Sequence, residues 1–267
     1  MYTMAARRLL LVLGSGAALK LDAFTRRQAI TTSTAALLTT TAIPPLPCSA
    51  STKGGVQWSI DVPDSFAVQQ QLASIVRVKV NSMFQADDPS SGASIKLLLL
   101  PFGQQAGGSL NSDEQLIVAK HFFDATPDAD GPKNVATTMA TSASRSPNIQ
   151  SLSRFGGEKG YSAADGARYV QYRYESSRCS EPLDDGECFG SSSKRKTLAT
   201  VAMSSLSQYR TNTERERMQA LGQERNVQVL WLLTLTAPAD AWPKLEPQFE
   251  GIANSFVVPL KPKEAVS

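Results

Sequence analysis

Residues 227–237 (VQVLWLLTLTA) carry no charge and place apolar side chains on both sides of an extended chain. Such a segment is typical of a strand buried in a sheet. We therefore expect residues 227–237 to form the most buried strand of the chain.

Several other segments alternate apolar and polar residues, which is the period of a half-buried strand. They are residues 56–62, 75–84 and 167–177, and further strands are expected at 196–206 and from Ile149. Residues 93–103, which follow 75–84 after a turn, are apolar enough for a strand that lies centrally in a sheet. We expect residues 56–62, 75–84 and 93–103 to pair as an antiparallel meander, because the segments that join them are short.

Two segments have the pattern of helices. Residues 111–125 begin with a capping Asn111 or Ser112 and acids in the first turn, and we expect one apolar side made by Leu116, Ala119, Phe122 and Phe123. The second helix begins near Trp242 and repeats apolar residues at helical spacing, with Pro247 close enough to disturb it: Leu245, Phe249, Ile252 and Phe256.

Residues 125–147 are rich in Ala, Thr, Ser, Pro and Asp, which predicts a long surface loop. The order is strands, a helix, more strands and a closing helix. This order indicates an α+β fold, in which helices cover a mainly antiparallel sheet.

The first 50 residues have the pattern of two targeting segments in tandem. Residues 1–24 begin with Arg7 and Arg8 and continue into an apolar core, the layout of a signal peptide. Residues 25–50 repeat this layout in weaker form, as a transit or thylakoid-lumen targeting segment. Their uncharged run is short and rich in Ser and Thr, whereas a membrane-spanning helix needs about 20 apolar residues.

The second targeting segment has two recognisable ends. The pair Arg26 and Arg27 suggests the twin-arginine export route, and Cys48-Ser49-Ala50 has the small residues of a cleavage site after Ala50. Two segments in tandem imply that two membranes are crossed, which predicts the thylakoid lumen of a plastid. The alternative is an ordinary secreted protein whose true start codon lies further along the chain.

Removing this prefix changes what the composition means. Residues 51–267 form one domain's length of chain, and the net charge falls from +3 to −1 without the prefix. The basic character belongs to the targeting segments, so it does not indicate a nucleic-acid partner.

Two cysteines remain in this domain, Cys179 and Cys188, on either side of a turn rich in Pro, Asp and Gly. An even pair so close in sequence indicates a local disulfide in an oxidising compartment. Two free thiols are the alternative. A zinc site would need further ligands, and the chain has one histidine.

The sequence shows no arrangement typical of a catalytic site, and we expect the protein not to be an enzyme. His121 lies in the predicted helix without an evident nucleophile, so a structural role is the simpler interpretation. Residues 126–137 resemble an EF-hand loop through Asp128, Asp130 and Gly131, but threonine occupies its first and last positions. We therefore identify no metal or cofactor site.

Two charged clusters have weaker implications. The turn between the cysteines contains acids that could gather a cation: Glu181, Asp184, Asp185 and Glu187. A basic cluster could face an acidic protein or anionic lipid headgroups: Lys194, Arg195, Lys196, Arg210, Arg215 and Arg217. For both, a solvated surface is the alternative.

Three stretches in order resemble the PsbP family of extrinsic lumenal photosystem II proteins. They are VQWSIDVPDSF (56–66), ADGARYVQYRYES (164–176) and NVQVLWLLTLTAPADAWPKLEPQFEGIANSF (226–256). The first resembles the family's opening strand, the second its Asp-Gly turn and tyrosine-rich strand, and the third its closing strand, tryptophan and helix.

The resemblance implies an α/β/α sandwich and a non-catalytic monomer bound peripherally to the thylakoid membrane. Its partners would be lumenal subunits of photosystem II, in support or assembly of the oxygen-evolving complex. Calcium retention is a possible further role implied by the family, although only residues 51–55 precede the first predicted strand. Alternatives are an assembly factor for photosystem I or the plastid dehydrogenase-like complex, or an unrelated lumenal binding or hydrolytic function.

Overall fold

The computed structural model describes residues 50–55, 57–72, 81–102, 110–124, 128–181, 188–207, 217, 220–221 and 226–258. The chain divides into two compact units, Met1–Pro44 and Pro45–Ser267, and every described residue belongs to the second. Arg26 and Arg27 therefore lie outside the described residues. Within the described part, no helix is long and apolar enough to cross a membrane.

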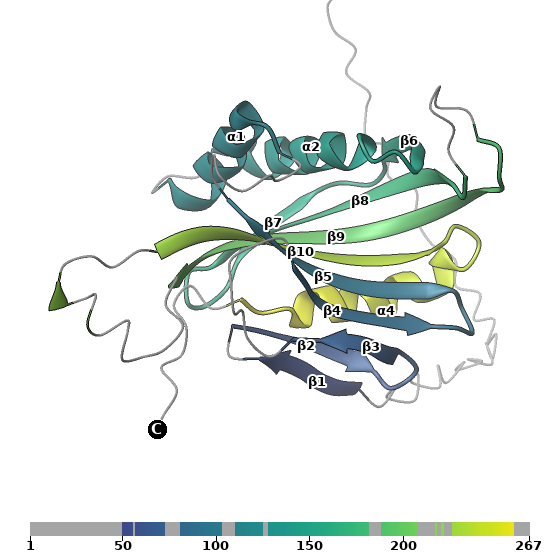
Figure 1. Cartoon of the computed structure of the whole chain (residues 1–267), viewed down its shortest axis with the longest axis horizontal. Helices are drawn as coiled ribbons and strands as arrows, with labels where there is room; N and C mark the ends of the chain where they lie inside the picture. The colour runs from purple at the N-terminus through teal and green to yellow at the C-terminus, as the bar shows by residue number, and fades with distance from the viewer. Residues whose placement is uncertain are drawn as a thin grey trace, which may run out of the picture. The chain divides into compact units, whose positions relative to one another are not determined.

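Most strands join one antiparallel sheet in the order β3-β4-β5-β10-β9-β8-β6, with β7 paired to β8 (Figure 1). A separate antiparallel pair is formed by β1 and β2. The strands are β1 Ala50–Gly55, β2 Trp58–Pro63, β3 Ala67–Gln71, β4 Asn81–Asp88, β5 Ala93–Pro101, β6 Ile149–Arg154, β7 Lys159–Ser162, β8 Arg168–Cys179, β9 Ser192–Ser207 and β10 Asn226–Pro238. The helices are α1 Ser112–Phe123, α2 Gly131–Ser144 and α4 Trp242–Ser255.

Strand β10 is buried on both of its faces, as the apolar run 227–237 predicted, and β5 lies between β4 and β10, as predicted for residues 93–103. Strand β10 itself pairs with β5 on one side and β9 on the other. Leu230 and Trp231, which point to opposite faces, are both fully buried. The apolar side chains on both faces of β10 are therefore covered by other parts of the protein.

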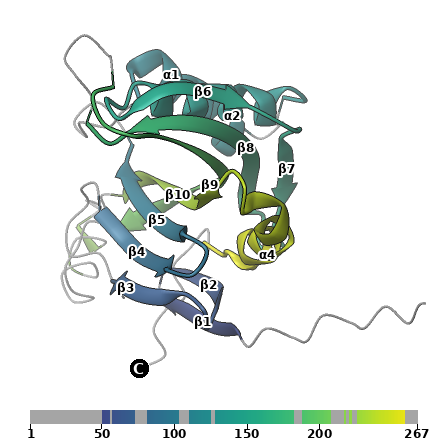
Figure 2. The ribbon, with the colours of Figure 1, turned by 90° about the vertical axis from the view of Figure 1, so that its right-hand side faces the viewer.

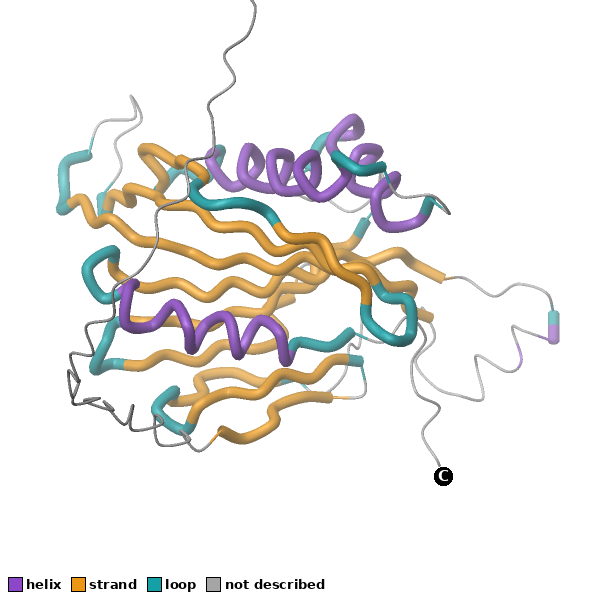
Figure 3. Tube along the Cα trace, turned by 180° about the vertical axis from the view of Figure 1, so that it is seen from behind, coloured by secondary structure: helices purple, strands orange, loops and turns teal. Residues whose placement is uncertain are grey.

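Each face of the sheet carries its own apolar core. On one face, α1 and α2 pack on β8, β9 and β10 through a cluster that includes Val118, Met139 and Tyr172. On the other face, α4 and the β1–β2 pair pack through a cluster that includes Trp58 and Trp242. Figures 2 and 3 show these layers, with α4 on the opposite side from α1 and α2. The α+β fold with helices on both faces agrees with the sequence prediction.

The predicted three-stranded meander is wrong in its first member. Strand β2 pairs with β1 rather than with the large sheet, while β4 and β5 are antiparallel neighbours as expected. The alternation of Trp58 and Ile60 fits any half-buried surface, and here that surface faces α4. The middle segment is tested only from residue 81, because residues 73–80 lie outside the described part.

The predicted loop over residues 125–147 is also wrong, because residues 131–144 form α2. Pro132 stands in its first turn, where a missing N–H is tolerated. Val135, Ala136 and Met139 are buried against the sheet. Small Ala, Ser and Thr side chains allow this helix to lie close to the strands, and the same composition had suggested a loop.

The first helix is confirmed, but its predicted apolar side is wrong. The buried residues of α1 are Glu114, Val118 and His121, whereas the Leu116 side chain is 70% exposed. Glu114 and His121 therefore face the interior together with Val118, and of the residues predicted for the apolar side Phe122 is partly buried against the same cluster. The contacts of Glu114 and His121 explain why.

Candidate functional site

A pocket of about 270 Å³ opens where the end of α1, the start of α2 and the β7–β8 hairpin meet. It is lined by His121, Asp128, Ala129, Pro132, Gly160, Tyr161, Ser162 and Arg168. Several of these side chains are titratable, which makes this pocket a candidate functional site within the described residues.

His121 is buried at the wall of this pocket, with 6% of its surface exposed. Burial lowers its pKa below the usual value, and the nearby charge of Arg168 lowers it further. The ring is therefore neutral near pH 7. Its Nδ1 atom is buried and has no hydrogen-bond partner among the described residues. The partner that orients the ring of a general base is therefore not found within the described part of the chain.

The close approach of His121 to α2 requires glycine at position 131. A Cβ on Gly131 would lie 2.3 Å from Nδ1 of His121, well inside contact distance. The histidine ring thus lies where a side chain of residue 131 would otherwise be. This contact packs the end of α1 against the start of α2.

The two charged groups of the pocket hold helix ends in place. Arg168 donates from Nη1 to the backbone carbonyls of His121 and Asp124, at 2.8 Å each, which caps the end of α1. Asp128 accepts from the Asp130 amide through Oδ1 at 3.1 Å, and its carbonyl accepts from the Gly131 amide at 2.9 Å. Arg168 and Asp128 are therefore engaged in supporting α1 and α2.

Tyr161 forms the remaining aromatic wall. Its ring stacks on Tyr169 with centroids 5.0 Å apart, and its hydroxyl accepts from Gln171 at 3.3 Å. Burial raises the pKa of Tyr161 to about 12, so it stays a neutral phenol. Among the described residues, Arg168, Asp128 and Tyr161 of this pocket are thus all engaged with neighbouring elements.

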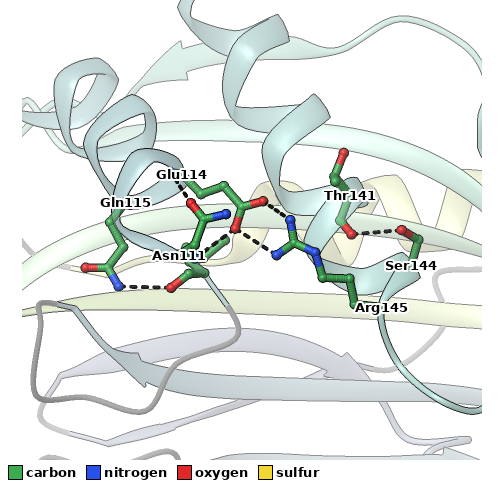
Figure 4. A network of polar contacts seen from close by, with 7 residues as sticks. Asn111, Glu114, Gln115, Thr141, Ser144 and Arg145 are labelled. Atoms are coloured by element: carbon green, nitrogen blue, oxygen red, sulfur yellow. Dashed lines mark hydrogen bonds and ion pairs between the residues drawn. The ribbon is translucent and has the colours of Figure 1, made fainter.

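The other ends of the two helices meet in a polar network (Figure 4). Asn111 and Glu114 form a capping box, each side chain accepting from the other's backbone amide at 2.9 Å. Glu114 also forms a two-pronged ion pair with Arg145 at the end of α2. The Arg145 hydrogen bond lowers the pKa of the Glu114 carboxyl. This contact explains why a glutamate faces inward from α1.

Cys179 and Cys188 form a disulfide, with their Cα atoms 5.6 Å apart. Cys179 ends β8 and is buried. The bond closes the turn that leads to β9. Of the acids in this turn, Glu181 is described and exposed, while Asp184, Asp185 and Glu187 lie outside the described residues.

The residues suggested for calcium do not form an EF-hand loop. Gly131 through Thr137, which would supply positions 6 to 12, are helical in α2. Among the described residues, no group of three or more His, Cys, Asp or Glu side chains could hold a metal ion.

The basic cluster is divided by the strand that carries it. Lys194 and Lys196 alternate with Arg195 along β9, so Arg195 points to the opposite face of the sheet. Lys196 lies over the Phe155 ring, 5.0 Å from its centroid. Arg210 and Arg215 lie outside the described residues. These residues are consecutive in the sequence, so the basic cluster alone did not show that its side chains lie on two faces.

No family model matches this chain, and no curated protein matches it in sequence. Among solved structures, it is similar to the solution structure of a cyanobacterial PsbP (CyanoP) from Synechocystis sp. PCC 6803. The identity is 12%, the likeness covers 80% of this chain and 95% of that one, and the TM-score is 0.41. A likeness so distant carries no argument about function.

Proposed function

We propose that this chain is a PsbP-like protein of the thylakoid lumen that binds photosystem II and supports its oxygen-evolving complex or its assembly without catalysis. The proposal rests on the three stretches that resemble the PsbP family and on the tandem targeting segments. It is supported by the way in which the structure brings those stretches together.

The three stretches meet in one core, which is the observation that carries the proposal. Ser59 of the first pairs with Val257, directly after the third, through two backbone hydrogen bonds of 3.0 and 2.9 Å. Tyr169 of the second donates its hydroxyl to the Val258 carbonyl and accepts from the Val258 amide. The family-like residues are thus the ones that join β2, β8 and the end of α4.

The Asp-Gly turn of the second stretch also has a structural role. Gly166 has φ of +86°, a conformation that residues with a Cβ rarely adopt. Asp165 accepts from the Ala167 amide through Oδ1 at 3.0 Å. Together they turn the chain from β7 into β8, which supports reading this stretch as a fold signature.

Strand β3 is a suitable docking edge for a partner protein. It lies at one end of the described sheet, and all five of its residues are exposed. Val68 on β3 and Leu72 directly after it expose apolar surface there. An exposed edge of this kind can accept a strand from another chain.

In this proposal, calcium is bound by the partner complex. We assign no calcium ligands to the chain itself. A role in calcium retention would therefore act by covering the site on photosystem II.

The test is co-purification from thylakoid membranes. A tagged chain should bring down photosystem II subunits from solubilised membranes, and a high-salt wash should release it. Val68→Lys should reduce this recovery, whereas Leu116→Lys, at an exposed apolar residue of α1, should not. Recovery with photosystem I or dehydrogenase-like subunits instead would favour the assembly-factor alternative, and recovery of no membrane complex would contradict the proposal.

A further inference from the structure

Two arginines lie near each other on the sheet face that carries α1 and α2. Arg178 is on β8 and Arg195 on β9, in a register that pairs Ser176 with Arg195 and Ser193 with Arg178. The arginines are therefore diagonal neighbours on the same face, a relation that long side chains can span. Burial and the charge of Arg178 both lower the pKa of Arg195.

Donors beside these arginines are buried without acceptors. Among the described residues, the Nε atom of Arg178 and the hydroxyl of Ser176 have no hydrogen-bond partner, and Ser176 is only 1% exposed. A buried donor without an acceptor is costly, so each such group in a folded protein calls for an explanation. An anionic acceptor beside the two cations would supply a partner for both donors.

A row of hydroxyl groups completes this cluster. Thr197 on β9 and Thr236 on β10 are buried and joined through their hydroxyls at 3.0 Å. Tyr174 lies directly opposite Thr197 in the register of β8 and β9. Ser176, Arg178 and Arg195 thus continue a row of polar side chains on this face of the sheet.

Negative charge is scarce around the two guanidinium groups. No ion pair joins either arginine to a carboxylate among the described residues. Asp87 on β4 acts on Arg195 through its charge, and Nη2 of Arg195 donates to the Gly92 carbonyl at 2.6 Å. Among the described residues, Asp87 is thus the carboxylate whose charge acts on Arg195, while Asp184, Asp185 and Glu187 of the cysteine turn lie outside them.

We propose that Arg178, Arg195 and the Ser176 hydroxyl form a binding site for a phosphate-type oxyanion. Planar guanidinium forks bind phosphate and carboxylate oxygens in pairs, and charge-assisted hydrogen bonds of this kind are the strong ones. A phosphate has enough oxygens to engage both forks and the serine together. A single carboxylate has two oxygens and is satisfied by one fork.

The same chemistry has two sources, a free phosphate or phosphorylated metabolite and the headgroup of an anionic lipid. Inorganic phosphate probes the first source, and vesicles containing phosphatidylglycerol probe the second. This site is independent of photosystem binding, because it lies on the opposite face of the sheet from the core that joins the three family-like stretches.

The experiment is calorimetric titration of the full-length protein with inorganic phosphate at low chloride. We expect saturable binding at one site per chain, weakened about tenfold or more by Arg178→Gln or Arg195→Gln, since a lost hydrogen bond to a charged group has that effect. Arg195→Lys keeps the positive charge but loses the paired donors of the guanidinium group. Its affinity for phosphate should therefore lie between those of the wild type and Arg195→Gln. Lys194→Gln is the matched control. It removes the same charge from the residue next to Arg195 on β9, whose side chain lies on the opposite face of the sheet.

Folding is checked by thermal unfolding without phosphate, which should be little changed in Arg178→Gln, since removing one of two like charges also relieves repulsion. If phosphate does not bind, vesicle co-sedimentation that Arg195→Gln abolishes and Lys194→Gln spares would assign the site to lipid headgroups. Binding to neither probe, or equal weakening by Arg195→Gln and Lys194→Gln, would overturn the proposal. Equal weakening would mean general attraction to a positive surface.

Discussion

At the scale of single residues, His121 shows most clearly how burial changes the pKa of a side chain. It is the one histidine of the chain, it is buried, and its pKa is lowered by that burial. The sequence placed it on a helix beside Phe122 but could not show that it faces Gly131. That contact joins residues of different elements, and no periodic pattern reports it.

The lowered pKa predicts a dependence of stability on pH. Below the ordinary value of 6.5, the unfolded chain binds a proton at His121 that the folded protein does not. Stability should therefore fall as the pH drops from 7.5 to 5.5, and less so in His121→Gln. Urea unfolding of both proteins at the two pH values measures the difference, and an equal loss in both would show that His121 is not responsible.

At the scale of elements, the sequence predicted those with a strong period or a cap. The capping residues of α1 and the alternation of β8 and β9 identified them correctly. Helix α2 was missed because its small residues give a weak apolar side, and the burial of its Val135 and Met139 depends on contact with the sheet. The inward side of α1 was missed because Glu114 is buried with its partner Arg145, which lies at the end of α2.

The network at the start of α1 gives a second prediction. Asn111→Ala should lower the free energy of unfolding by about 1 kcal/mol, the usual effect of removing an N-cap. Glu114→Gln should also destabilise the protein near pH 7. Because the pKa of Glu114 is lowered in the folded state, its contribution is present above its ordinary value of 4.5 and is lost as the pH falls through the folded value.

Chemical denaturation of the wild type, Asn111→Ala and Glu114→Gln at pH 7 and pH 3 checks both effects. Gln115→Ala serves as a control on the same turn, since its side chain bonds only to the Leu110 carbonyl among the described contacts. A difference between wild type and Glu114→Gln that is equal at the two pH values would contradict the electrostatic explanation.

At the scale of the whole molecule, one buried tyrosine connects the second family-like stretch to the end of the third. Tyr169 lies on β8, packs on Phe256 and Tyr161, and bonds to the backbone of Val258. The sequence predicted the strand and the helix that it joins, along with the α+β arrangement. The β1–β2 pairing and the bond from Tyr169 to Val258 depend on contacts between distant segments, which a local pattern does not reveal.

Tyr169→Phe tests this connection with little change in volume. Both the amide and the carbonyl of buried Val258 lose a partner, which should lower the free energy of unfolding by about 1–3 kcal/mol. Tyr161→Phe is the comparison, because its hydroxyl has only the longer bond from Gln171. Denaturant midpoints of the two variants measure the effect, and equal loss would argue against a special role for Tyr169.

The central claim is that the chain works in the thylakoid lumen, and its mature N-terminus and compartment test that claim most directly. Intact plastids would be isolated, thylakoids treated with protease and then washed with salt, and the chain identified by mass spectrometry of its first residue. We predict a protease-protected chain that begins near Ser51, after Ala50, and is released when the thylakoids are opened and washed. A chain found outside the plastid that retains residues 25–50 would contradict the claim.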